Sequence, residues 1–184
     1  MQPIKRLANG LAALASSEHY LFSPSDLRVL LADLSDQAFK TLLTRAVSAG
    51  LLQRVCRGIY LYPQTSVPQG LVLYHAAARL RAGAFNYLSL ESVLSEAGVI
   101  SQVPLNWITV MSSGRSSIIP CAQWGSIEFV HTARTPDAVA PALQYDVRGH
   151  VWRASVMQAL QDMRATRRTT LELVDWTAAK EFGV

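Results

Sequence analysis

The segment from Ser35 to Gly50 constrains the fold most, because its apolar residues recur at helical spacing and a glycine ends it. The apolar stripe consists of Phe39, Leu42, Leu43, Ala46 and Val47. The opposite face carries two cations, no acid and several short polar side chains: Gln37, Lys40, Thr41, Thr44, Arg45 and Ser48. A merely solvated helix face usually mixes acids with bases, so this pattern predicts an amphipathic helix whose outer face suits a polyanion.

A basic hairpin is predicted directly after this helix. Residues 51–62 contain two short apolar runs on either side of Arg57-Gly58, where glycine can adopt a positive φ. Arg54 and Arg57 both lie on this hairpin. Its position immediately behind the polar helix places four cations within one short stretch of chain.

Two more helices are predicted ahead of the polar helix. Residues 3–16 have apolar residues at helical spacing, and Ser23-Pro24-Ser25-Asp26 is a helix start that leads to about Leu34. Three helices followed by a basic hairpin are the arrangement of a winged helix-turn-helix, which places its third helix in the major groove of DNA. The residues therefore predict a DNA-binding domain over residues 1–63.

The rest of the chain predicts a second domain over residues 64–184, after a connector with Pro63 and Pro68. An extended segment from Tyr87 is expected to enter a short helix that Ser89 caps and Gly98 ends. Strands are expected at 107–111, 117–120 and 126–131, and helices at 70–82, 153–165 and 170–180. The predicted fold class is α+β: a winged helix-turn-helix, then a mixed α/β domain.

Composition and charge narrow the class of protein. Half of the residues are apolar, which argues against disorder, and no apolar run is long enough for a transmembrane helix. The N-terminal segment lacks the features of a signal peptide, so a cytoplasmic protein without membrane contact is expected. Residues 1–63 hold seven basic and four acidic residues, a net charge of +3 out of +4 for the chain. This asymmetry indicates a polyanionic partner for the first domain.

No motif in the sequence indicates catalysis. Cys56 and Cys121 are the only cysteines, and the four histidines are scattered, so neither a disulfide framework nor a metal site is expected. Phosphate-binding loops, dinucleotide fingerprints and nucleophile elbows are absent from the sequence. We therefore expect no catalytic residue, no metal and no cofactor, although a site assembled from distant residues leaves an enzyme as an alternative.

Longer stretches of the chain resemble the AbiEi family of antitoxins. The likeness lies in "GLLQRVCRGIYLYP", in "YLSLESVLSEAGVISQVP" with the following "ITVMSSGRSSIIPCAQWGSIEFVHT", and in "RASVMQALQDMRATRR". In the last stretch Val156-Met157 stands where family members often carry a proline. The resemblance covers most of the chain, and its middle stretch is the more distinctive part.

The resemblance implies a repressor of its own toxin–antitoxin operon. Such a protein binds inverted repeats in the promoter, as a monomer or weak dimer that pairs on DNA, and counteracts a nucleotidyltransferase-type toxin. Two alternatives stay open: a protein-interaction module that neutralises the toxin directly, and an enzyme that modifies the toxin.

The predicted site residues fall into three groups. Direct DNA contacts are expected from Gln37, Lys40, Thr41, Thr44, Arg45, Arg54 and Arg57. Lys5 and Arg6 are expected to contact the DNA backbone. A second basic cluster, Arg164, Arg167 and Arg168, either forms a partner surface or complements the negative end of a helix.

Overall fold

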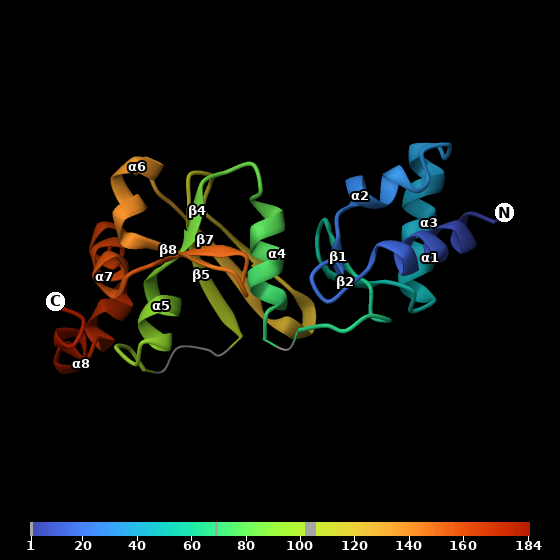
Figure 1. Cartoon of the computed structure of the whole chain (residues 1–184). Coiled ribbons are helices and arrows are strands. Elements are labelled where there is room, and N and C mark those ends of the chain that lie inside the picture. The colour runs from blue at the N-terminus through green and yellow to red at the C-terminus, as the bar shows by residue number, and fades with distance from the viewer. Residues whose placement is uncertain (1, 69, 102–105) are drawn as a thin grey trace. The chain divides into compact units, whose positions relative to one another are not determined.

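The computed structural model describes residues 2–68, 70–101 and 106–184 (Figure 1). The chain divides into two compact units, Met1–Val72 and Leu73–Val184. Each unit contains both helices and strands, so the expected mixed α+β class is confirmed.

The N-terminal unit consists of three helices and a small sheet. Its elements are α1 (Pro3–Leu14), β1 (Leu21–Phe22), α2 (Pro24–Val29), α3 (Asp36–Ser48), β2 (Gln53–Cys56) and β3 (Ile59–Leu61). The strands form an antiparallel sheet in the order β1-β3-β2. The three predicted helices and the hairpin are thus confirmed, whereas β1 is too short to have left a pattern in the sequence.

Side-chain caps fix where the helices of this unit begin. Ser23 and Asp26 form a reciprocal capping box at the start of α2, and the Ser35 hydroxyl accepts a hydrogen bond from the Ala38 amide at the start of α3. The predicted end of α2 near Leu34 is wrong, because the helix ends at Val29. Beyond it the backbone amides of Leu31 and Leu34 bond three residues back, which gives separate turns instead of α-helix.

The apolar stripe of α3 lies in the core of the N-terminal unit. This core contains Leu7, Leu11, Phe22, Leu27, Leu31, Phe39, Leu42, Leu43, Ala46, Leu52 and Tyr62. Because one side of α3 is buried in this way, its polar side is left at the surface. Gly50 follows α3 with a φ of 71°, and Gly58 lies in the turn of the hairpin with a φ of 86°. Both have the positive φ that was expected of them.

The C-terminal unit is built on a mixed six-stranded sheet. Its helices are α4 (Val72–Leu80), α5 (Leu90–Glu96), α6 (Pro136–Val139), α7 (Val156–Ala165) and α8 (Trp176–Lys180). Its strands are β4 (Asn86–Leu88), β5 (Trp107–Ser112), β6 (Ser117–Pro120), β7 (Ser126–His131), β8 (Leu143–Asp146) and β9 (Val151–Ala154). Three short 3-10 helices lie at Ala122–Trp124, Ala140–Ala142 and Thr169–Leu173. The strand order is β6-β7-β5-β4-β9-β8.

Side chains pack on both faces of this sheet. Tyr87 and Thr109 point to one face, where they bond to Asp162 of α7 and Ser92 of α5. Phe129 points to the other face, where the guanidinium of Arg81, just after α4, lies 4.5 Å from its ring centroid. The inner strands are therefore covered on both sides, which explains their nearly continuous burial.

Three details of the C-terminal unit differ from the predictions. Residues 153–165 do not form one helix, because Val151–Ala154 is a strand and Ser155 caps α7 behind it. Residues 170–180 form a 3-10 turn and the short α8. Ser89 precedes α5 but makes no cap, because its hydroxyl donates to the Asp162 carboxylate at 2.7 Å.

Candidate nucleic-acid interface

The outer face of α3 is exposed along its whole length. Its polar side chains are Gln37, Lys40, Thr41, Thr44 and Arg45, all of which are exposed. The structure brings these five predicted residues together on one helix, whose opposite side is anchored in the core. A rigid helix with one free polar face is a geometry that can enter the major groove.

The two threonines of this face use their hydroxyl hydrogens within the helix and keep their hydroxyl oxygens as acceptors. Thr41 donates its hydroxyl hydrogen to the Gln37 carbonyl at 2.9 Å, and Thr44 donates to the Lys40 carbonyl at 3.1 Å. Their hydroxyl oxygens then keep lone pairs for an incoming donor. A threonine in this state can accept a hydrogen bond from a base amino group, and its methyl group can contact thymine.

The charge of the α3 face is positive. Within the described part of the chain, no carboxylate lies within salt-bridge distance of Lys40 or Arg45. The acid at the start of the helix, Asp36, is instead bonded by the Arg28 guanidinium at 3.1 Å. Two cations therefore remain available on this face for phosphates or guanine edges.

The hairpin is fixed to the end of α3. The backbone amides of Leu51 and Leu52 both donate to the Ala46 carbonyl, at 2.9 and 3.2 Å. Arg54 lies on β2 and Arg57 at the turn, and both side chains are exposed. Neither arginine forms an ion pair with any residue for which a position is described. These two hydrogen bonds thus fix the start of the hairpin, which carries two more cations, to the end of α3.

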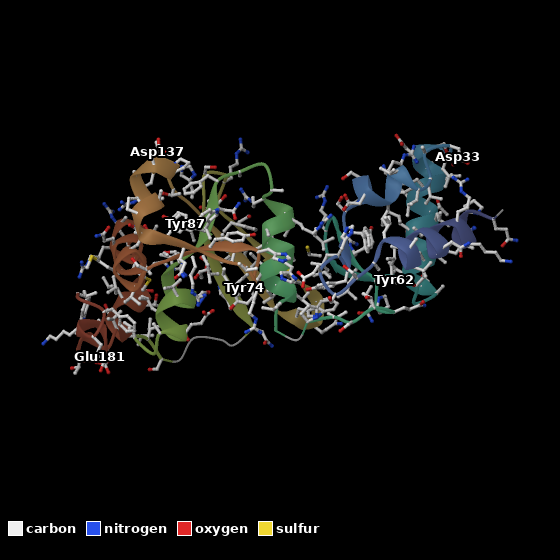
Figure 2. The ribbon with its side chains drawn as sticks, in the orientation of Figure 1. Asp33, Tyr62, Tyr74, Tyr87, Asp137 and Glu181 are labelled. Carbon is white, nitrogen blue, oxygen red and sulfur yellow. The ribbon has the colours of Figure 1, made fainter. Side chains whose placement is uncertain are left out.

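Lys5 and Arg6 are placed differently from each other. Lys5 is exposed, whereas Arg6 donates to both carboxylate oxygens of Asp33, at 2.5 and 2.8 Å, and to the Leu30 carbonyl. The hydrogen bond from Arg6 lowers the pKa of Asp33 to about 2. Asp33, labelled in Figure 2, belongs to the connection from α2 to α3, so Arg6 ties α1 to this connection.

The three C-terminal arginines do not form one surface. Arg164 lies over the ring of Trp176 at 5.5 Å, and Arg167 is exposed with a φ of 53°. Arg168 is held inside its unit by Glu91 and Glu128, whose hydrogen bonds raise its pKa. Of these three arginines, only Arg164 and Arg167 are therefore exposed.

The C-terminal unit contains a buried polar cluster around Asp162 that is not predicted from the sequence. The Asp162 carboxylate is fully buried and accepts hydrogen bonds from Tyr87, Ser89 and Gln158, at 3.1, 2.7 and 2.8 Å. Burial first, and then the nearby Asp162 charge, raises the pKa of Tyr87. Tyr87 and Ser89 lie more than seventy residues from Asp162, so no local pattern signals the contact.

Two of the four histidines lie together in the structure. His75 and His150 stack with ring centroids 4.4 Å apart, although they are far apart in the sequence. In the parts of the chain that are described, no three His, Cys, Asp or Glu side chains are grouped to hold a metal ion. No helix there combines the length and apolar character needed to cross a membrane.

Comparison with known proteins supports the family resemblance for the N-terminal unit. Residues 11–63 match the family model described as "Transcriptional regulator, AbiEi antitoxin". No curated protein matches the chain. The matched segment runs from within α1 to the end of the β2–β3 hairpin and contains all of α3. The likeness seen in the sequence is thereby confirmed for this segment: residues 11–63 match the AbiEi family of antitoxin transcriptional regulators.

Proposed function

We propose that the N-terminal unit is a winged helix-turn-helix that binds double-stranded DNA with α3 in the major groove and the β2–β3 hairpin as its wing. The observation that carries this proposal is the outer face of α3, where five exposed polar residues include two cations without a carboxylate partner among the described residues. The match of residues 11–63 to a transcriptional regulator family supports it independently.

The side chains of α3 suit the reading of base edges. Arg45 and Lys40 can each donate to the O6 and N7 atoms of guanine, and the Gln37 amide can pair with adenine. Each good bidentate contact discriminates against a wrong base by about 1–3 kcal/mol. Thr41 and Thr44 add acceptors and methyl groups on the same face.

The remaining predicted contacts are to the DNA backbone. Arg54 and Arg57 on the wing would bind phosphates, which position the helix without carrying sequence information. Lys5 can add a further phosphate contact, whereas Arg6 would first have to leave Asp33. We propose Arg6 chiefly as the residue that holds α1 in place.

The biological role that we propose is repression of the protein's own toxin–antitoxin operon. Two copies, monomeric or weakly dimeric in solution, would pair on inverted repeats in the promoter, because a dyad site presents the same half-site twice. The regulator would also counteract a nucleotidyltransferase-type toxin. The family match supports the regulator and antitoxin parts of this role.

Fluorescence anisotropy with a labelled fragment of the promoter tests the DNA-binding proposal. Lys40→Ala combined with Arg45→Ala removes two base contacts and should weaken binding by about a hundredfold or more. Arg164→Ala combined with Arg167→Ala removes the same charge from the C-terminal unit and serves as the control. If the α3 double variant binds the promoter as tightly as the wild type does, α3 is not the reading helix.

A second candidate function for the C-terminal unit is direct binding of the toxin. Tyr145 and Trp152 lie on the β8–β9 hairpin with ring centroids 5.3 Å apart, and 45% and 47% of their surfaces are exposed. Val147 in the turn between them is 73% exposed. Exposed aromatic residues of this kind dominate many protein interfaces. Co-purification of the toxin with the wild type, and its loss with Trp152→Ala, would support this function over an indirect one.

A further inference from the structure

A groove of about 770 Å³ lies between the beginning of α1 and the outer side of α3. Gln2, Pro3 and Ile4 form the α1 side of the groove, and residues from Leu34 to Ala49 form the other side. Sites for small molecules in proteins typically have volumes of about 300–1,000 Å³. The groove is therefore large enough for a compact organic ligand.

The floor of the groove is apolar. We define the floor as the apolar part of the lining, which includes Ile4, Leu34, Ala38 and Leu42. Ile4 and Leu34 are half-buried and packed against the core of the unit. An apolar ligand body on this floor would leave water without displacing any side chain from the core. Uncharged polar side chains also line the groove: Gln2 on the α1 side, and Ser35, Gln37 and Thr41 on the other side.

The charge around the groove favours an anion. Arg45 is the one charged side chain among the described residues that line it, and no acid lies in the first turn of α1, where the helix dipole is positive. The nearest acids along the chain, Asp33 and Asp36, are already bonded by Arg6 and Arg28. A cation at the rim of an apolar groove complements a carboxylate attached to an apolar body.

We propose that this groove binds a small organic carboxylate, with the carboxylate on Arg45 and the apolar body on the floor. Gln37, Thr41 and Arg45 line the groove and also belong to the face that we propose for DNA. The ligand and DNA therefore compete for the same side chains, a consequence that rests on the proposed function. Occupancy of the groove releases the protein from its operator.

Isothermal titration of the full chain with decanoate tests the site without DNA. Decanoate is expected to bind more tightly than 1-decanol, which lacks the charge, and decylammonium is expected not to bind. Arg45→Gln should weaken decanoate binding about tenfold, the loss of one charge-assisted contact, and leave decanol unaffected. Equal binding of all three amphiphiles would overturn the proposal, because it would show unspecific adsorption.

A variant that fills the groove tests whether decanoate binds there. Ala38 is exposed on α3 and lines the floor, so Ala38→Phe should abolish decanoate binding without disturbing the core. Ala12→Phe adds the same ring to an exposed position of α1 that does not line the groove, and it should bind decanoate as the wild type does. Unchanged binding by Ala38→Phe would place decanoate elsewhere and overturn the proposal.

Competition on the promoter fragment separates this inference from the proposed function. Decanoate at about nine times its Kd should raise the apparent Kd for DNA about tenfold, as expected for mutually exclusive ligands. Lys40 does not line the groove, so Lys40→Ala should weaken DNA binding alone. If decanoate binds but no DNA does, the DNA-binding proposal fails and the carboxylate site stands. If DNA binds but decanoate neither binds nor competes, the carboxylate site fails and the DNA-binding proposal stands.

Discussion

Arg168 and Glu128 form a bidentate ion pair, with Nη1 at 2.6 Å from Oε1 and Nη2 at 2.9 Å from Oε2. The same guanidinium donates through Nε to Glu91 Oε1 at 2.7 Å. Glu91 belongs to α5, Glu128 to β7, and Arg168 follows α7, so one side chain joins three elements of the C-terminal unit. The Glu91 side chain is only 4% exposed, so its buried negative charge needs the neighbouring cation of Arg168.

Arg168→Met should destabilise the C-terminal unit by about 3 kcal/mol, because it leaves a buried and a partly buried carboxylate without their cation. The Thr170 hydroxyl still donates to Glu91 and limits the loss. All four tryptophans lie in this unit, so urea unfolding followed by tryptophan fluorescence measures its stability. Arg167→Met, at the exposed neighbouring position, is the control and should change stability little. Equal midpoints for the two variants would contradict the structural role of Arg168.

The same ion pair should make stability depend on pH. Burial alone would raise the pKa of Glu128, but the hydrogen bonds and charge of Arg168 outweigh it and lower this pKa below its ordinary value of 4.5. A lowered pKa in the folded state gives stability that is present above the ordinary value and is lost as the pH falls through the lowered one. The difference in unfolding free energy between the wild type and Arg168→Met should therefore be largest near neutral pH and shrink in acid. A difference that stays constant into acid would argue against the ion pair.

Asp162→Asn should destabilise the C-terminal unit by about 1–3 kcal/mol, because Tyr87, Ser89 and Gln158 all donate to this buried carboxylate. An asparagine keeps one acceptor oxygen but replaces the other with an amide donor, so it cannot accept all three of these hydrogen bonds. Asp137→Asn, at an exposed position of α6, makes the same chemical change without these partners. Figure 2 labels Asp137 and Tyr87, which lie in different parts of the unit. Unfolding of both variants by urea, followed by tryptophan fluorescence, checks the difference.

The sequence predicts the N-terminal unit well because its signals are local. The apolar stripe of α3, the Ser23 and Ser35 caps and the glycines at 50 and 58 each act within a few residues, and the structure confirms them. The residues proposed to contact DNA follow from the exposed face of α3 and the adjoining hairpin, and they stay predictions.

The C-terminal unit is predicted less well because its contacts are distant in the chain. The predicted helix at 153–165 overlaps the last two residues of β9, since α7 begins only after its cap at Ser155. Strand β8 is an edge strand that pairs only with β9, and its apolar alternation of Leu143 and Tyr145 spans only four residues. The sequence leaves Arg168 either on a partner surface or at the end of a helix, because its actual partners Glu91 and Glu128 lie 77 and 40 residues away.

Ser35→Ala should weaken the start of α3 by about 1 kcal/mol, because the Ser35 hydroxyl accepts a hydrogen bond from the Ala38 amide. Ser35→Asp should keep the cap and favour the positive end of the helix dipole. Amide hydrogen exchange of the first turn of α3 measures the change locally, without depending on the C-terminal unit. Equal exchange in wild type and Ser35→Ala would show that the cap contributes nothing.

Arg54→Gln combined with Arg57→Gln should lower the salt dependence of promoter binding. If each arginine binds one phosphate, the slope of log K against log salt concentration should become shallower by about 2, since each phosphate contact contributes about 0.9. The preference for the operator over unrelated DNA should stay nearly constant, because phosphate contacts carry no sequence information. Lys40→Ala with Arg45→Ala should instead reduce that preference. Anisotropy titrations of both fragments at several salt concentrations distinguish these outcomes. An unchanged slope would show that the hairpin does not contact DNA. A lost preference for the operator would show that Arg54 or Arg57 reads a base.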